Sequence, residues 1–305
     1  MYEIIFNPGS RGHHGASVWN TVKKILDEKD IEYLLYETTH AGHAEELAYE
    51  LTSDEKEHTF IVIGGDGTLN EVINGLVNPN LITIGLIPAG SGNDFAKSLK
   101  IPTSPELALE RILNNIQTTP INFGEIHLNN SYKRFIISCG CGFDSDVCCD
   151  VQVSPFKPIL NKLGMGKLIY TLIALKKLIT KSVFSATIKL DDDYVISLDD
   201  IFFLIAMNTK YEGGGYKFCP DADPSDDKLD FLTATNISRC RLLKLLPKAK
   251  RGTHIGHKGI SITPAKKISL HFSKAVNLHT DGEVYGKCDH VTITCAKDHV
   301  NFLLD

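Results

Sequence analysis

An apolar run that ends in glycines and restarts at once as an amphipathic helix limits the folds open to this chain. It occupies residues 60–76, with the sequence FIVIGGDGTLNEVINGL. Where a parallel strand ends, the first amides of the following helix lack intrahelical partners and form a donor-rich pocket suited to phosphate. Glycines at 64, 65 and 67 permit positive φ and let phosphate oxygens approach the backbone. The stretch therefore predicts a phosphate-binding loop between a strand and a helix.

Two polar residues of this loop favour a nucleotide bound together with a metal ion. The carboxylate of Asp66 would repel bound phosphate unless a divalent cation or its water shell stood between them. Thr68 is expected to cap the helix while it contacts phosphate. The G-x-x-x-x-G-K-[ST] pattern is absent here, so the loop is not of the Walker type.

Two further loops repeat the same strand–glycine–helix logic. PAGSGNDFA at residues 88–96 follows the next apolar strand, and NPGSRG at residues 7–12 follows the first one. Because the carboxyl ends of parallel strands meet at one edge of a sheet, the three loops are expected to form a crevice there. Ligands bind at such crevices in doubly wound folds.

The pattern of expected helices and strands changes at about residue 121. Before it, strand-like and helix-like segments alternate, which predicts a Rossmann-like α/β domain with a parallel sheet covered on both faces. After it, β-rich segments dominate, with one helical interruption near residues 162–179, which predicts an antiparallel sandwich or barrel. The expected domains are residues 1–121 and 122–295, and the last strand, within residues 296–305, can return to either.

Composition excludes several classes of protein. The 305 residues are 43% hydrophobic and 23% charged, as in an ordinary globular protein, and the net charge of -5 argues against a general nucleic-acid binder. The opening MYEIIFNPGS has no signal-peptide pattern, and the apolar run at residues 168–175 is far below the roughly 20 residues that span a bilayer. Eight cysteines follow no metal-binding spacing. We expect a cytoplasmic protein with at most peripheral membrane contact.

Four motifs, taken in order, carry a family resemblance. They are GGDGTLNEVINGL, PAGSGNDFA, GGG at 213–215 followed by PDADPSDDKLDF, and TDGE at 280–283. GGDGT alone is shared with NAD kinases and phosphofructokinases, but the ordered set resembles the bacterial soluble diacylglycerol kinase and lipid kinase family, which is related to sphingosine kinases. The resemblance implies a Rossmann-like three-layer nucleotide domain of the NAD kinase and phosphofructokinase type. It also implies a β-sandwich lipid-substrate domain, with the active site in the cleft between the two.

The resemblance also implies a reaction, transfer of the γ-phosphate of ATP to the hydroxyl of diacylglycerol or a related lipid, with Mg²⁺. Asp281 would be the general base, and Glu283 would orient a water, a metal or its neighbour. The residues matched to nucleotide contacts are Asn7, Pro8, Gly9, Ser10, Arg11, Thr38, Gly64, Gly65, Asp66, Gly67, Thr68, Leu69, Asn70 and Ser91, supported by Gly90, Gly92, Asn93 and Asp94.

A structural Mg²⁺ site is implied in the DADPSDDK stretch. Asp226 matches the liganding carboxylate, and the positions of Asp223 and Lys228 supply nearby groups, such as backbone carbonyls. The chain departs from the family at two places. Asp227 stands where the family has glycine, and Asn122 stands where relatives commonly have aspartate.

Simpler interpretations stay open beside these. A lone Asp-Gly-Glu is usually a turn, and the acidic stretch near Asp226 is by itself most often a solvated one. Acids are absent from residues 151–190 and 239–274, which indicates either a solvated basic face or a surface that docks on anionic membrane. The remaining alternative functions are a soluble-substrate kinase of the NAD kinase type and a non-catalytic lipid or nucleotide sensor. A homodimer is the oligomeric state left open.

Overall fold

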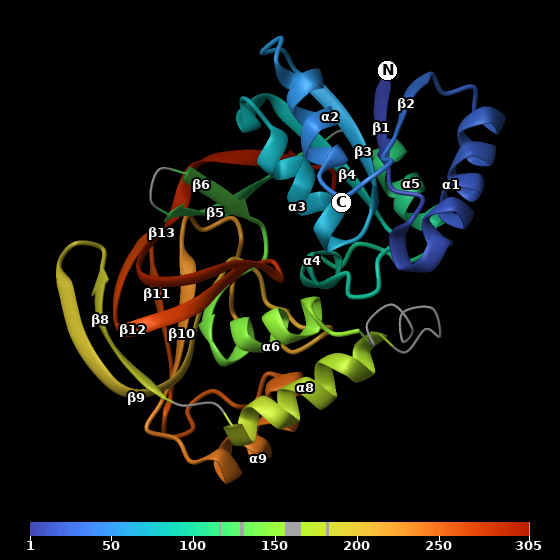
Figure 1. The fold of residues 1–305 in the computed structure, drawn as a ribbon. Helices are drawn as coiled ribbons and strands as arrows, with labels where there is room; N and C mark the ends of the chain where they lie inside the picture. The colour runs from blue at the N-terminus through green and yellow to red at the C-terminus, as the bar shows by residue number, and fades with distance from the viewer. Residues whose placement is uncertain (116, 129–130, 156–165, 181–182, 305) are drawn as a thin grey trace. The chain divides into compact units, whose positions relative to one another are not determined.

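A computed structural model describes residues 1–115, 117–128, 131–155, 166–180 and 183–304 (Figure 1). The chain divides into two compact units. Unit 1 is Met1–Phe123 with Lys297–Asp305, and unit 2 is Gly124–Ala296. The last strand therefore returns to the unit that contains the glycine loops.

Unit 1 is built on a parallel sheet. Its strands are β1 (Tyr2–Phe6), β2 (Tyr33–Glu37), β3 (His58–Gly64), β4 (Ile82–Pro88) and the end of β13 (Glu283–Phe302), in the order β13-β4-β3-β1-β2. Every neighbouring pair in this order is parallel. A parallel sheet needs helical crossovers that cover both faces, which explains why the strands β3 and β4 are almost wholly apolar.

Helices cover both faces of this sheet, as the alternating sequence predicts (Figure 1). They are α1 (Ser10–Glu28), α2 (His43–Thr52), α3 (Asp66–Gly75), α4 (Asp94–Ser98), α5 (Pro105–Asn114) and the short η1 (Pro79–Leu81). On one face, Val18 and Val22 of α1 and Ile112 of α5 pack against Ile61 and Ile63 of β3. The alternate residues of β3 are equally buried, because α2 and α3 lie over the other face.

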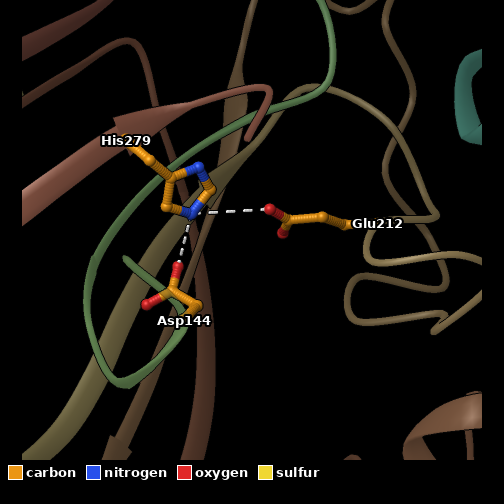
Figure 2. A group of neighbouring side chains, drawn as sticks. All are labelled: Asp144, Glu212 and His279. Carbon is orange, nitrogen blue, oxygen red and sulfur yellow. Dashed lines mark hydrogen bonds and ion pairs between the residues drawn. The ribbon is translucent and has the colours of Figure 1, made fainter. Parts of the chain in front are cut away.

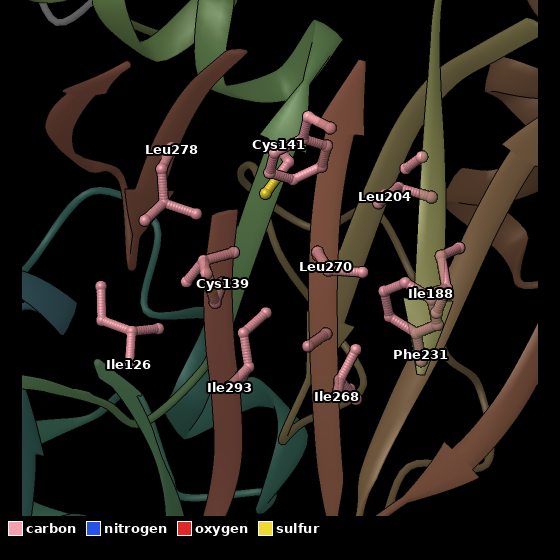
Figure 3. Close-up of a cluster of buried hydrophobic side chains, with 14 of the residues drawn as sticks. Ile126, Cys139, Cys141, Ile188, Leu204, Phe231, Ile268, Leu270, Leu278 and Ile293 are labelled. Atoms are coloured by element: carbon pink, nitrogen blue, oxygen red, sulfur yellow. The ribbon is translucent and has the colours of Figure 1, made fainter. Parts of the chain in front are cut away.

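Unit 2 is an antiparallel β structure around its own apolar core. Its strands are the second half of β5 (Thr119–Leu128), then β6 (Ser131–Phe135), β7 (Ser138–Gly142), β8 (Phe184–Leu190), β9 (Tyr194–Met207), β10 (Leu229–Thr235), β11 (Ile260–Ala265), β12 (Lys267–Thr280) and the first part of β13. The core includes Cys139, Leu204, Leu270 and Ile293, drawn from four different strands (Figure 3). Its cysteines are reduced and pack as small apolar side chains.

The prediction of a single helical interruption in unit 2 is wrong. The described residues contain α6 (Phe143–Gln152), α8 (Gly166–Thr180) and α9 (Arg239–Arg251), while residues 162–165 of the predicted helix lie outside them. Leu242 of α9 packs against the sheet face formed by Phe203 and Ile205. This packing stabilises α9 although Pro247 lies inside it, because tertiary contacts outweigh local helix propensity.

A mostly buried histidine of unit 1 gives the fold a pH dependence. His58 Nδ1 lies 2.7 Å from Glu3 and Nε2 lies 2.9 Å from Asp54. Burial lowers the pKa of His58, but its hydrogen bonds to the two carboxylates outweigh burial and raise it. A raised pKa means that the folded state holds the proton more tightly, so this stabilisation is complete below about pH 6.5 and is lost as the pH rises through the folded value.

We expect His58→Gln to reduce the free energy of unfolding more at pH 6 than at pH 9. Urea denaturation of both proteins across this range measures the difference. A wild-type advantage that stays constant with pH would show that the imidazole contributes through packing and not through its charge.

Candidate active site

Main-chain hydrogen bonds bring the carboxyl ends of the four consecutive strands of unit 1 together. The bonds run from Thr38 N–H to Phe6 O at 2.9 Å, from Asn7 N–H to Ile63 O at 3.0 Å, and from Ala89 N–H to Gly64 O at 2.7 Å. The three predicted glycine loops and Thr38 therefore share one edge of the sheet. We call this set of strand ends the loop edge.

Two glycines at the loop edge are required by the fold itself. A Cβ on Gly65 would press on the backbone of Gly90, and a Cβ on Gly90 would press on that of Gly65 and on the Asn93 side chain. The two loops can touch only because both residues lack a side chain. Asn93 completes the contact, since its amide accepts from Gly90 N–H and donates to Gly90 O, each at 3.0 Å.

Gly67 is different, because nothing in the fold explains it. It is exposed, its φ lies outside the left-handed region, and a Cβ there would meet no atom within 4 Å. A side chain at this position would only occupy space in front of the first turn of α3. That is where the unpaired amides of a helix amino terminus attract phosphate.

Asp66 has a structural role that the sequence did not reveal. Its carboxylate accepts from Asp94 N–H at 3.0 Å and from Phe95 N–H at 3.2 Å. The side chain thus caps α4 from another element and connects the loop after β3 to the loop after β4. Asp66 is held in place before any ligand binds.

The expectation that Thr68 caps α3 is wrong. The residue at the amino-terminal cap is Gly65, and no side chain caps the helix. Thr68 is buried within the first turn, and its hydroxyl accepts from the Asn7 amide at 3.0 Å. It therefore connects α3 to the loop after β1.

The loop after β1 is tighter than a simple turn. The helix α1 begins inside NPGSRG, and Arg11, Gly12 and His13 have left-handed φ values of 47°, 65° and 73° within it. Arg11 is exposed, whereas Ser10 is buried. Of the other predicted contacts, Ser91 is exposed, while the side chains of Leu69 and Asn70 are buried in α3.

The proposed base of unit 2 is held by three amides. Asp281 Oδ2 accepts from Ile136 N–H at 2.8 Å, and Oδ1 accepts from Ile137 N–H at 3.0 Å and Ser138 N–H at 2.9 Å. Asp281 has a φ of 49°, and its own N–H donates to Ser138 O at 3.0 Å. The three donors fix the orientation of the carboxylate that the turn presents. The neighbouring Glu283 is exposed and accepts from the Tyr285 hydroxyl at 3.4 Å.

The predicted structural metal stretch is an exposed turn whose carboxylates bond to their own backbone. Asp226 Oδ1 accepts from Lys228 N–H at 3.0 Å, and Asp223 Oδ1 accepts from Ser225 N–H at the same distance. Asp227 has a φ of 60°, the left-handed conformation that the family glycine would adopt more easily. The second departure, Asn122, is buried in β5.

We expect Asp226→Ala to abolish binding of Mg²⁺ to this turn. Carboxylate and carbonyl oxygens are the ligands that hard cations prefer, and Asp226 is the carboxylate that matches the family. Isothermal titration of Mg²⁺ in the absence of nucleotide measures the effect, with the neighbouring Asp221→Ala as control. Identical titrations of wild type and Asp226→Ala would remove the site.

A buried cluster near Asp281 was missed by the sequence reasoning. His279 precedes the base by two residues, and its Nδ1 accepts from Gly282 N–H at 3.3 Å. Its other ring nitrogen contacts Asp144 at 2.8 Å and Glu212 at 3.6 Å. No local pattern joins positions 144, 212 and 279, because the packing of α6 and of the segment between β9 and β10 against β12 brings them together.

Two family models cover most of this chain. Residues 2–126 match the diacylglycerol kinase catalytic domain, and residues 140–302 match the YegS C-terminal NAD kinase beta sandwich-like domain. The chain belongs to the diacylglycerol kinase and lipid kinase family. The resemblance and the two-domain fold class expected from the four motifs are both confirmed.

Individual relatives agree with this assignment. A diacylglycerol kinase of Bacillus subtilis strain 168 is 30% identical over 285 residues, which cover 93% of this chain and 89% of that protein. The crystal structure of a diacylglycerol kinase from Bacillus anthracis str. Sterne has a TM-score of 0.70 at 19% identity and covers 100% of this chain and 96% of that one. An NAD kinase from Archaeoglobus fulgidus in complex with ATP has a TM-score of 0.55 at 14% identity, with 99% and 93% covered. The two structures show a shared fold.

Proposed function

We propose that this family member transfers the γ-phosphate of Mg-ATP to the hydroxyl of diacylglycerol or a related lipid alcohol. The observation that carries the proposal is the loop edge, where Gly67 leaves the amino terminus of α3 open although the fold does not need a glycine there. The names of the relatives supply the lipid class. An NAD kinase shares only the first loop motif, whereas TDGE at 280–283 belongs to the lipid kinase set.

The residues of the loop edge fit a metal-bound nucleotide. Amides at the start of α3 face the phosphates, and the carboxylates of Asp66 and Asp94 offer the oxygen ligands that Mg²⁺ prefers. Bound Mg²⁺ neutralises charge on the phosphates. The oxygen of the lipid hydroxyl bonds to the γ-phosphorus while the bond between the γ-phosphorus and the bridging β-phosphate oxygen breaks, which releases ADP. Asp281 accepts the proton of the lipid hydroxyl in this step. A carboxylate suits this role, because the proton leaves late.

An apolar pocket in unit 2 supports an acceptor with a hydrocarbon part. It has a volume of about 70 Å³, and its lining includes Phe143, Phe218 and Leu242 together with Asp144 and His254. Burial lowers the pKa of His254 and so favours its neutral ring. The space admits a short apolar group beside two polar ones.

Incubation with labelled ATP and either mixed-micelle diacylglycerol or NAD tests the proposal. We expect label in the lipid fraction alone. Label in NAD would favour a soluble-substrate kinase, and label in neither would favour a non-catalytic sensor. Mass spectrometry of products from a total lipid extract then identifies the acceptor.

We also propose that unit 2 contacts an anionic membrane surface. The helix α8 exposes Leu172, Leu175 and Ile179 at 56%, 41% and 67%, a spacing that places them along one side. The basic residues exposed on α9 are Arg239, Arg241, Lys244, Lys248, Lys250 and Arg251. Apolar side chains beside a basic face are typical of peripheral binding. Among the described residues, no helix is long and apolar enough to cross a membrane.

Vesicle sedimentation tests this contact. We expect binding to phosphatidylglycerol vesicles that weakens when salt is raised to about 0.5 M, and weaker binding to neutral phosphatidylcholine vesicles. Replacement of Leu172 and Ile179 by glutamine should reduce the bound fraction. Binding that ignores both lipid charge and salt would contradict the proposal.

A further inference from the structure

Three side chains from distant parts of unit 2 form a buried cluster, shown in Figure 2. His279 comes from β12, Asp144 from the first turn of α6, and Glu212 from the segment between β9 and β10. His279 Nε2 lies 2.8 Å from Asp144 Oδ2 and 3.6 Å from Glu212 Oε1. The imidazole is fully buried, and the carboxylate side chains are only 16% and 14% exposed.

The backbone leaves room for this cluster at one glycine. Gly140 of β7 pairs with His279 across the sheet, and a Cβ there would overlap both the Asp144 carboxylate and the imidazole. The Ser145 hydroxyl donates to Gly140 O at 2.6 Å, which fixes the start of α6 beside the same glycine. Gly140 is therefore needed for the close approach of Asp144 to His279.

When both carboxyl groups are ionised, the cluster carries more negative charge than its own residues can balance. One imidazolium can compensate only one of two carboxylates, and a neutral imidazole compensates neither. Asp144 Oδ1 and Glu212 Oε2 are also buried with no hydrogen-bond partner among the described residues. A buried carboxylate oxygen without a partner is costly, so the site calls for a cation.

Burial raises the pKa of Glu212 to about 7, so a proton on this carboxyl group removes part of the negative charge. A cation bound at the cluster would displace that proton.

We propose that Asp144, Glu212 and His279 bind a divalent transition-metal cation of the Zn²⁺ type, separate from the Mg²⁺ of the nucleotide. Their ligand atoms all lie within 4.8 Å of one another, which suits a cation about 2.0–2.2 Å from each after a small adjustment. One imidazole with two carboxylates favours Zn²⁺ over Mg²⁺, because Mg²⁺ prefers oxygen ligands alone. The cation would also give a partner to one of the buried carboxylate oxygens.

Binding would reach the turn that carries Asp281. The cation takes the Nε2 lone pair, so that nitrogen loses its proton and the neutral ring carries one on Nδ1. Gly282 N–H then loses its acceptor, the 3.3 Å contact to Nδ1. Since Gly282 directly follows Asp281, occupancy of the cluster is linked to the conformation of the base. Displacement of the proton held by Glu212 also makes the affinity rise with pH.

Calorimetric titration of chelator-treated protein with Zn²⁺, without nucleotide, tests the site. We expect one equivalent to bind, tighter at pH 8 than at pH 6, and to resist displacement by millimolar Mg²⁺. Glu212→Gln keeps the shape of the side chain and should weaken binding by at least about 10-fold, given that even outer partners of metal ligands contribute 10–100-fold. Asp221→Asn, at an exposed position of the same unit, should bind Zn²⁺ as the wild type does.

Absence of stoichiometric Zn²⁺ binding to the wild type would overturn the proposal, whatever the variants do. Equal affinity in wild type and Glu212→Gln, with thermal unfolding showing both proteins folded, would assign the Zn²⁺ to another place. If Glu212→Gln does not fold, the absorption spectrum of Co²⁺ bound to the wild type serves as the second test. A spectrum that shows no nitrogen ligand on the Co²⁺ would contradict the site. These readouts do not involve catalysis, so they stand or fall apart from the proposed kinase activity.

Discussion

Replacement of Asp281 by asparagine is expected to lower the rate of phosphoryl transfer by about 10²–10⁴-fold while nucleotide binding persists. The amide cannot accept the proton of the lipid hydroxyl. It also turns an NH₂ group toward amides that the carboxylate oxygens bind now, at 2.8 Å to 3.0 Å. Single-turnover kinetics with saturating lipid, together with calorimetric ATP binding, separates the chemical step from binding.

The control for this prediction must separate chemistry from folding. Three charge-assisted hydrogen bonds end on Asp281, so Asp281→Ala is expected to reduce the free energy of unfolding by about 2–4 kcal/mol as well. Kinetics are therefore compared below the unfolding temperature of the variants, with Glu283→Gln as a neighbouring carboxylate replacement. Near-normal turnover of folded Asp281→Asn would remove the assignment of the base.

The loop edge was predictable because its determinants are local in the sequence. Apolar strands, glycines and the amphipathic helix that follows each occur within a few residues, and the rule that parallel strands end at one edge does the rest. Asp66 shows where this reasoning stops. Its partners Asp94 and Phe95 lie 28 and 29 residues away, and the pairing of β3 with β4 and the contact of Gly65 with Gly90 bring the two loops together.

Unit 2 was predicted in outline but not in its details. Period-2 apolar segments indicated an antiparallel sheet, yet α9 was missed because its exposed basic residues and Pro247 mask the few apolar positions that dock on the sheet. The cluster of His279 with Asp144 and Glu212 has no local signal at all. It depends on pairing of β12 with β7 and on the missing side chain of Gly140.

Gly67→Ala is expected to weaken ATP binding by roughly 5- to 150-fold, the loss that overpacking of about 1–3 kcal/mol implies, without reducing stability. A methyl group at this position meets no protein atom within 4 Å, so the folded chain accepts it. Alanine is in addition the better helix former by up to about 1 kcal/mol. The methyl group instead occupies the space in front of the α3 amides, where we place the phosphates. Calorimetric ATP titration and urea denaturation of the same preparation measure the two effects.

Gly90→Ala is the matched contrast, since its methyl group would press on Gly65 and Asn93. It should reduce both the free energy of unfolding, by about 1–3 kcal/mol, and ATP affinity. The pair of variants distinguishes a glycine that lets two loops touch from one that lets a ligand approach. Gly67→Ala protein that is as stable as the wild type and binds ATP equally well would show that the phosphates do not lie against the first turn of α3, and the kinase proposal would lose the observation that carries it.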